Sequence, residues 1–117
     1  MTKLRYRIWD NKNRKYLDPG TVAAMGDGDI WHLKDDKALP DCSVELSCGF
    51  TDLQGIQVYD GDIVRIKGSN WLVSYTEGNA RFDLVGFGEM RGQVAHAWHV
   101  KEGNVIGDLH HNLELTK

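Results

Sequence analysis

The 117-residue sequence contains only two cysteines, only two prolines and no long apolar run. A membrane-spanning helix needs about 18 consecutive apolar residues, and a secretory signal needs an apolar segment close to the start of the chain. The chain opens instead with Met-Thr-Lys-Leu-Arg. We therefore expect no membrane association and a cytoplasmic protein, in which Cys42 and Cys48 stay as free thiols.

The chain also lacks an excess of positive charge. Its 14 Lys and Arg residues are outnumbered by 17 Asp and Glu residues, so the formal net charge is −3. A protein that coats nucleic acid is usually basic, because phosphate neutralisation dominates its affinity. We interpret the densest basic stretch, near the N-terminus, as solvated strand and turn positions. It consists of Lys3, Arg5, Arg7, Lys12, Arg14 and Lys15.

Thirteen glycines lie among many short apolar runs, which indicates turns between strands. About eight short strands are expected, with a turn signal about every 8–12 residues. The predicted segments are a hairpin over 4–17 and strands at 30–33, 44–50, 56–59, 62–67, 71–75, 80–85 and 104–109. This pattern favours one mainly β domain over 1–117. We expect a small antiparallel barrel or sandwich, an SH3-like barrel being one form, with loop excursions and little helix.

Other segments carry weaker signals. The stretch 22–29 is rich in Gly and Asp without a clear period, and 35–42 is predicted to be an exposed loop. The region 18–43 is read as an excursion from the barrel whose order is left open. The segment 93–100 is either a short helix or a strand, 86–92 is loose, and 110–117 is a polar tail.

Alternation predicts which side chains face the core. Leu4, Tyr6 and Ile8 share one face of the first strand, opposite Trp9 and the neighbouring arginines. Later strands alternate in the same way. We expect Val44, Leu46 and Cys48 to point inward together, and only one of Ile63 and Val64 to do so. A tight turn is expected at Gly68-Ser69-Asn70.

A metal centre would have to be drawn from scattered cysteines and histidines. The candidates are Cys42, Cys48, His32, His96, His99, His110 and His111. Structural zinc sites usually place each ligand pair two to four residues apart, and the two cysteines are farther apart than that. We therefore predict no metal site and no cofactor.

Catalytic motifs are equally sparse. Cys48 followed by Gly49 resembles a nucleophile only if His96 or His99 comes within hydrogen-bonding distance. Gly86-Phe87-Gly88 is too short to hold a phosphate, and the common hydrolase, nucleotide and metalloprotease motifs are missing. We predict that the protein has no catalytic residues and is not an enzyme.

The segment 50–64 is the most informative part of the chain. Its three acids, Asp52, Asp60 and Asp62, could in principle perform acid–base chemistry or hold Mg²⁺. Asp and Gly are also the residues that turns need, since Asp binds nearby backbone N–H groups and Gly accepts a positive φ. We interpret the three acids, with Gly55 and Gly61, as structural turn residues.

Binding residues are predicted from basic and aromatic side chains on shared strand faces. Arg5, Arg7 and Trp9 could stack on bases, form a protein interface, or be covered on both sides by the chain itself. Arg65 and Lys67 extend the nucleic-acid alternative to the central strand.

Three segments together resemble the YopX family of phage and prophage proteins. They are Arg-Tyr-Arg-Ile-Trp-Asp at 5–10, the central segment at 50–64 and Val-Ile-Gly-Asp-Leu-His-His-Asn-Leu-Glu-Leu at 105–115. The family pattern departs from this chain in four places. Phe50 stands where Tyr is usual, no Gly follows Thr51, Asp60 replaces Glu, and Leu113 replaces Pro.

The resemblance implies phage origin, expression in the cytoplasm of an infected bacterium, a β-rich fold and self-association. It supplies no catalytic residues. The function expected is therefore that of a phage or prophage accessory protein, working as a homo-oligomer or through an unknown phage or host protein. The alternative is a nucleic-acid-binding module that uses the N-terminal basic and aromatic strand.

Overall fold

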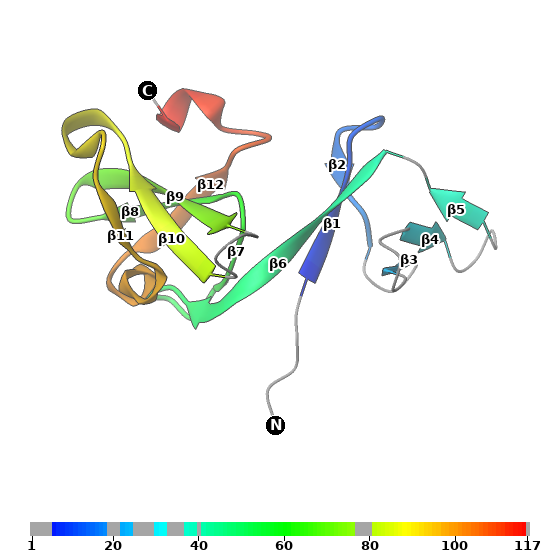
Figure 1. Ribbon diagram of the computed structural model, residues 1–117, viewed down its shortest axis with the longest axis horizontal. Coiled ribbons are helices and arrows are strands. Elements are labelled where there is room, and N and C mark those ends of the chain that lie inside the picture. Colours follow the sequence, from blue (N-terminus) through cyan, green and yellow to red (C-terminus); the bar gives the residue numbers. More distant parts are fainter. Residues whose placement is uncertain are drawn as a thin grey trace. The chain divides into compact units, whose positions relative to one another are not determined.

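The computed structural model describes residues 6–18, 22–24, 30–32, 37–39, 41–76 and 81–116. Antiparallel strands predominate in these residues, and the helices among them are short 3-10 turns (Figure 1). This confirms the predicted mainly β class with little helix. The chain divides into two compact units, a smaller one over Tyr6–Glu45 and a larger one that runs from Leu46 to Lys117.

The smaller unit begins with the predicted hairpin. Strands β1 (Tyr6–Asp10) and β2 (Lys15–Tyr16) pair antiparallel. Asp10 closes the turn between them, because its Oδ1 accepts from the backbone N–H groups of Lys12 at 2.9 Å and Asn13 at 3.1 Å. On its other side β1 neighbours β6 (Cys42–Thr51), whose residues through Glu45 belong to this unit.

A second, three-stranded sheet in the smaller unit has the order β3-β4-β5. Strand β4 (Ile30–His32) confirms the strand predicted at 30–33, whereas β3 (Val22–Ala24) lies in a stretch without a clear sequence period. Strand β5 (Lys37–Leu39) shows that the prediction of a loop over 35–42 was wrong at 37–39. These residues pair with β4 in the sheet, which a three-residue segment next to Asp-Asp and Pro40 did not indicate.

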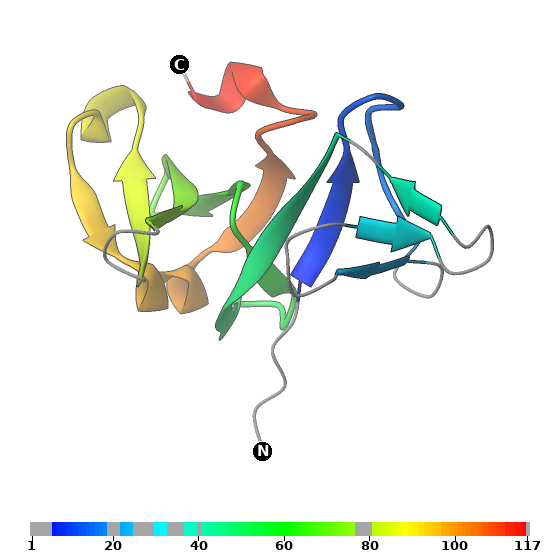
Figure 2. The same cartoon turned by 45° about the vertical axis from the view of Figure 1, so that its right-hand side comes forward.

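The larger unit contains a curled five-stranded sheet with the order β11-β10-β9-β8-β12 (Figures 1 and 2). Its strands are β8 (Asp62–Ile66), β9 (Ser69–Thr76), β10 (Arg81–Gly86), β11 (Val94–His96) and β12 (Asn104–Asp108). All neighbours are antiparallel, which agrees with the short turns between the predicted strands. The remainder of β6 pairs in this unit with the short strand β7 (Gln57–Tyr59).

The hairpin between β8 and β9 turns on two residues. Ile66 pairs with Ser69, and the intervening Lys67 and Gly68 have φ angles of 50° and 81°. Two consecutive positive φ values are the signature of the type I′ turn, whose twist matches that of the strands. The turn is therefore one residue earlier than the predicted Gly68-Ser69-Asn70.

The described residues of the larger unit include an apolar core cluster. Its buried members are Val58, Val64, Ile66, Trp71, Val73, Leu84 and Val100. Ile63 and Val64 are both fully buried, but only Val64 belongs to this cluster, so β8 is covered on both faces. A central strand that is covered on both faces loses the alternation expected of a half-buried one.

Strand β6 also departs from its predicted pattern. Val44 is exposed while its neighbour Glu45 is buried, with exposed fractions of 37% and 7%. The face predicted to be apolar is therefore turned outward at this point. Glu45 can be buried because Arg7 and Tyr16 hydrogen-bond its carboxylate.

The segment left open at 93–100 contains both alternatives. Strand β11 is followed by η3 (Ala97–Glu102), a 3-10 helix whose first turn is capped by the His96 side chain. Two further 3-10 helices are η2 (Gly88–Met90), in the stretch predicted to be loose, and η4 (Leu113–Thr116), in the predicted polar tail.

Candidate functional site

Asp52 organises the loop between β6 and β7. It is 4% exposed, and its Oδ1 accepts from the N–H groups of Gln54 and Ile56, both at 2.9 Å. Its Oδ2 accepts from the N–H of Val105 in β12, also at 2.9 Å. One carboxylate thus holds its own loop closed and fixes it to a strand more than 50 residues later in the chain.

The pKa of Asp52 reflects two opposing effects. Burial raises it, and the hydrogen bonds from Val105, Ile56 and Gln54 lower it. The hydrogen bonds prevail, so the pKa lies below its ordinary value of 3.8. The group is therefore an ionised hydrogen-bond acceptor near neutral pH, the opposite of the raised pKa that a general acid needs.

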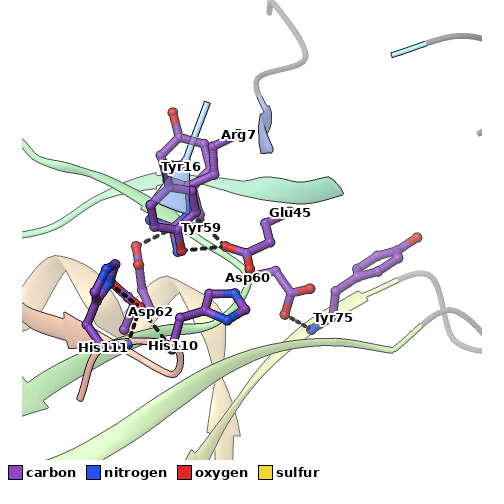
Figure 3. A network of polar contacts seen from close by, with 10 residues as sticks. Arg7, Tyr16, Glu45, Tyr59, Asp60, Asp62, Tyr75, His110 and His111 are labelled. Carbon is purple, nitrogen blue, oxygen red and sulfur yellow. Dashed lines mark hydrogen bonds and ion pairs between the residues drawn. The ribbon is translucent and has the colours of Figure 1, made fainter. Parts of the chain in front are cut away.

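Asp60 and Asp62 flank Gly61 at the turn into β8. The Oδ1 of Asp60 accepts from the backbone N–H of Tyr75 at 3.1 Å, as Figure 3 shows. The Oδ2 of Asp62, which is 2% exposed, accepts from the N–H of Tyr59 at 2.8 Å. Gly61 has a φ of 92°, which favours glycine. Both carboxylates therefore accept backbone hydrogen bonds at this turn.

The same loop presents apolar side chains to solvent. Leu53 is 66% exposed and Ile56 is 47% exposed, although both flank the buried Asp52. Ile106, at the irregularity in the pairing of β12 with β8, is 36% exposed and follows Val105. Leu53 is itself fixed, because its N–H donates to the carbonyl of Gly103 at 2.8 Å. We use the name Leu53 patch for the exposed side chains of Leu53 and Ile56 on this loop, together with Ile106, which follows the Val105 that Asp52 binds.

The basic and aromatic residues predicted on β1 have partners within the smaller unit. The Nε of Arg7 lies 2.7 Å from Glu45 Oε1, and the hydroxyl of Tyr16 donates to the same oxygen at 2.9 Å (Figure 3). Trp9 is 1% exposed and packs edge-to-face on Tyr16, with ring centroids 4.9 Å apart. Both Ile8 and Trp9 are buried, so β1 is not the half-buried strand that was predicted. Arg5 lies outside the described residues.

Arg65 and Lys67 are exposed and line different hollows beside the β8–β9 hairpin. The first is a polar hollow of about 280 Å³, whose walls include Arg65, Ser69, Phe87 and Glu89. Lys67 lines the second hollow, which we call the Trp71 pocket. The structure thus separates two cations that the sequence grouped into one binding face.

The Trp71 pocket has a volume of about 260 Å³. The buried side chains of Ile66, Trp71 and Leu84 line it. Met90 of η2 also lines it and is 38% exposed.

Polar side chains complete the lining of this pocket. Lys67 and Ser69 come from the hairpin, and His99 and Glu102 come from η3. His99 Nδ1 lies 3.2 Å from Glu102 Oε2. An apolar floor with a few polar groups is the usual construction of a binding pocket.

The candidate nucleophile has an unfavourable environment. Burial is the largest influence on the Cys48 thiol and raises its pKa. Backbone hydrogen bonds lower the pKa in part, and the charge of Asp62 raises it slightly. A raised pKa disfavours the thiolate, which is the reactive form. Burial also raises the pKa of Cys42, with contributions from Asp10 and Asp41.

The histidines do not gather around a common centre in the described residues. His99 pairs with Glu102, and His111 Nδ1 lies 2.9 Å from Asp108 Oδ2. His96 caps η3, and the side chain of His32 lies outside the described residues. Where side chains are described, no group of three or more His, Cys, Asp or Glu residues is placed to hold a metal ion.

Sequence reasoning missed the Leu53 patch and the Trp71 pocket. An available signal for the patch was the position of two large apolar residues inside a Gly-containing turn, where polar residues are usual. The pocket had no such signal, because its walls come from β8, β9, β10, β11 and two 3-10 helices that only folding brings together.

Fold and site together define a small, mainly β protein whose central motif is a structural loop with an apolar outer surface. The sequence model of the family described as YopX protein matches residues 5–117. The chain therefore belongs to the YopX family, as the three sequence segments indicated.

A solved structure with a similar fold is protein EF1440 from Enterococcus faecalis. The two chains superpose with a TM-score of 0.59 at 17% sequence identity, and the match covers 100% of each chain. This similarity bears on the fold alone. No curated protein is significantly similar to this sequence. Across the described residues, none of the helices is long and apolar enough to cross a membrane.

Proposed function

We propose that this protein is a phage- or prophage-encoded accessory protein that acts through protein–protein contact and is not an enzyme. It works in the cytoplasm of the bacterial host cell and assembles as a homo-oligomer through the Leu53 patch. Membership of the YopX family supports the accessory role. The observation that carries the proposal is the exposure of Leu53 and Ile56 on a loop held by a buried carboxylate.

The loop is suited to contact because it is already ordered. The hydrogen bonds of Asp52 and the bond from Leu53 to Gly103 fix the backbone on both sides of the exposed side chains. A preorganised surface loses less conformational entropy on binding than a loose one. Exposed apolar groups clustered on such a surface are typical of interaction sites.

The proposal that the protein is not an enzyme rests on the interactions of the candidate catalytic side chains. Asp52, Asp60 and Asp62 accept backbone hydrogen bonds, and Cys48 is disfavoured as a thiolate. These were the candidate residues for acid–base chemistry in the central motif and for nucleophilic chemistry just before it. Their interactions support a structural role for each.

The test is the concentration dependence of the oligomeric state. Sedimentation velocity on the whole protein should show self-association below about 100 µM, a range typical of weak specific contacts. The double substitution Leu53→Glu with Ile56→Glu should weaken it by at least about tenfold, because buried apolar anchors dominate interface energies.

Val94→Glu is the matched control. Val94 is 63% exposed, like Leu53, but it lies on β11 at the opposite end of the five-stranded sheet from β12. It should leave self-association unchanged. A monomeric wild-type protein throughout this concentration range, or an equal effect of Val94→Glu, would show that the Leu53 patch is not the interface.

A nucleic-acid-binding module is the second candidate. It is favoured by the polar hollow, where the guanidinium of Arg65 and the ring of Phe87 lie beside Ser69. Cationic and aromatic groups together suit single-stranded nucleic acid. The carboxylate of Glu89 in the same hollow opposes it, as does the pairing of Arg7 with Glu45.

This second candidate is tested by retention of single-stranded DNA or RNA at about 50 mM salt, where electrostatic affinity is high. Binding that falls with salt and with Arg65→Ala would support it. Lack of retention at that salt concentration would remove it.

A further inference from the structure

Lys67 occupies a backbone position that its side chain does not favour. Its φ is 50° in the first central position of the type I′ turn, where Asn, Asp or Gly is usual. Because lysine does not stabilise the backbone of this turn, its presence there points to a role for its side chain. Among the described residues, Lys67 forms no ion pair or hydrogen bond through its ammonium group.

The Trp71 pocket is where that side chain lies. Lys67 lines it beside Ser69, and the floor below consists of Ile66, Trp71 and Leu84. Met90 adds a flexible wall, and methionine adapts its shape to different apolar groups. A cation that has no partner in the described part of the chain therefore lies next to an apolar cavity.

We propose that the Trp71 pocket binds one large apolar side chain of a protein partner, with an acidic residue beside it in the partner's sequence bound by Lys67. The inference rests on the proposed function in one respect, namely that the partner is a protein. It assigns the kind of sequence that is recognised, and the residues that line the pocket are not those of the Leu53 patch.

The size of the pocket favours a side chain over a small molecule. Small-molecule sites usually have volumes of about 300–1,000 Å³. The Trp71 pocket, at about 260 Å³, falls below this range but accommodates one leucine or phenylalanine side chain. The rest of the peptide then lies across the opening, where the polar groups are.

The charges around the opening favour an acidic neighbour on the hairpin side. Lys67 lies there, whereas Glu102 lies on η3 and already pairs with His99. A carboxylate next to Lys67 completes an ion pair, and the same group next to Glu102 would be repelled. The apolar residue and the acid must therefore be adjacent in the bound segment.

The test is a titration of the ¹⁵N-labelled full chain with short capped peptides, followed by NMR at the indole N–H of Trp71. The probe is acetyl-Glu-Leu-Glu-amide, with Glu-Ala-Glu and Lys-Leu-Lys versions as controls. We expect a saturable shift with the first peptide. Replacing Leu by Ala should weaken binding at least about tenfold, as for truncated groups in apolar pockets.

The decisive variant is Lys67→Asn. Asparagine suits the type I′ turn, so folding is preserved while the cation is removed. Binding of Glu-Leu-Glu should weaken about two- to fivefold, as expected for a partly exposed ion pair. Arg65→Asn is the matched control, because it removes an exposed cation two residues away that does not line the pocket. It should leave binding unchanged.

Three results would overturn the inference. These are no saturable shift at Trp71 with Glu-Leu-Glu, equal binding of Lys-Leu-Lys, or equal effects of Arg65→Asn and Lys67→Asn. If peptides do not shift Trp71 but the Leu53 substitutions abolish self-association, the pocket assignment fails and the proposed function stands. If the protein is monomeric but Glu-Leu-Glu saturates Trp71, the homo-oligomer fails and the pocket stands.

Discussion

Asp52 shows how one residue determines local structure in this protein. Its carboxylate is buried, ionised and bound to three backbone N–H groups, two in its own loop and one in β12. A buried donor that loses its acceptor costs the full desolvation penalty of that group. The residue is therefore more important for stability than its place in a short loop suggests.

Asp52→Ala should lower the free energy of unfolding by about 2–4 kcal/mol at neutral pH, because it leaves buried N–H groups without an acceptor. Urea denaturation followed by circular dichroism measures the change. Asp83→Ala is the control, since the carboxylate of Asp83 pairs with the exposed Arg81 and its loss should cost less than about 1 kcal/mol. Equal costs for the two substitutions would contradict the assigned role.

The lowered pKa of Asp52 predicts how this contribution depends on pH. A carboxyl group whose pKa is lower in the folded state stabilises the protein above its unfolded pKa, near 3.8, and loses that effect as the pH falls through the folded value. The difference in stability between wild type and Asp52→Ala should therefore be largest at neutral pH and shrink below about pH 3.8. A stability difference that grew as the pH fell would contradict a lowered pKa for Asp52.

A substitution at Lys67 is expected to stabilise the protein, in contrast to the loss of Asp52. Lys67→Asn should raise the free energy of unfolding by about 0.5–1 kcal/mol, because Asn tolerates the positive φ of the turn better than Lys. Lys67→Ala removes the same charge without that tolerance and should not stabilise. Thermal unfolding of the three proteins in one buffer distinguishes a backbone effect from a charge effect.

At the scale of elements, the turn 60–62 joins strands that are distant in sequence. The N–H of Gly61 donates to the carbonyl of Val73 in β9, and its carbonyl accepts from Leu109, just after β12, both at 2.8 Å. The positive φ of one glycine therefore positions three segments at once.

Gly61→Val should destabilise the protein by about 2–3 kcal/mol, since a β-branched residue is strongly disfavoured at a φ of 92°. Gly61→Asn should cost less, because Asn tolerates positive φ. The midpoint of urea unfolding measures both. A stably folded Gly61→Val protein that had lost one binding activity would show that the turn has a functional role beyond structure.

The hairpins were predictable because their signals are local. Asp10 and Asn13 mark the first turn, and Asp60-Gly61 marks the start of β8. Strand faces were less predictable where both sides are covered, as at Ile63 and Val64, or where an ion pair lets a polar residue be buried, as at Glu45. Alternating apolar and polar residues predict a strand with one buried and one solvent-exposed face, and these strands do not follow that arrangement.

The candidate site was predictable to a smaller extent. Turn chemistry alone suggested that Asp52 binds backbone, but its bond to Val105 depends on a strand 53 residues away. Likewise, nothing in the order of residues places Met90 near Trp71. Contacts of this kind depend on the tertiary fold, which a local pattern does not contain.

At the scale of the whole molecule, the two compact units differ in their apolar cores. Among the residues whose side chains the structure describes, the core cluster of the larger unit has seven buried members, and that of the smaller unit has two, Ile8 and Val22, with Leu17 and Cys42 packed against them. Stability against local opening follows the density of buried contacts. The two units should therefore open at different rates.

Hydrogen exchange measured by mass spectrometry should show this difference. Amides in β8, β9 and β10, around Val64, Val73 and Leu84, should exchange most slowly, and amides in β1 and β2 should exchange faster. The control is exchange in urea at the unfolding midpoint, where the two sets should converge. Slower exchange in β1 than in β9 would show that core size does not set the order of opening.

The bonds of the Asp52 loop also limit how copies of the protein can join through backbone pairing. Strand β12 ends the five-stranded sheet, and its outward N–H at Val105 and the carbonyl of Gly103 before it are occupied by Asp52 and Leu53. Unpaired outer strands are templates for fibre growth. With these two groups occupied, β12 offers fewer backbone partners to an added strand at this end of the five-stranded sheet. The carboxylate that closes the Asp52 loop thus also covers part of a sheet edge.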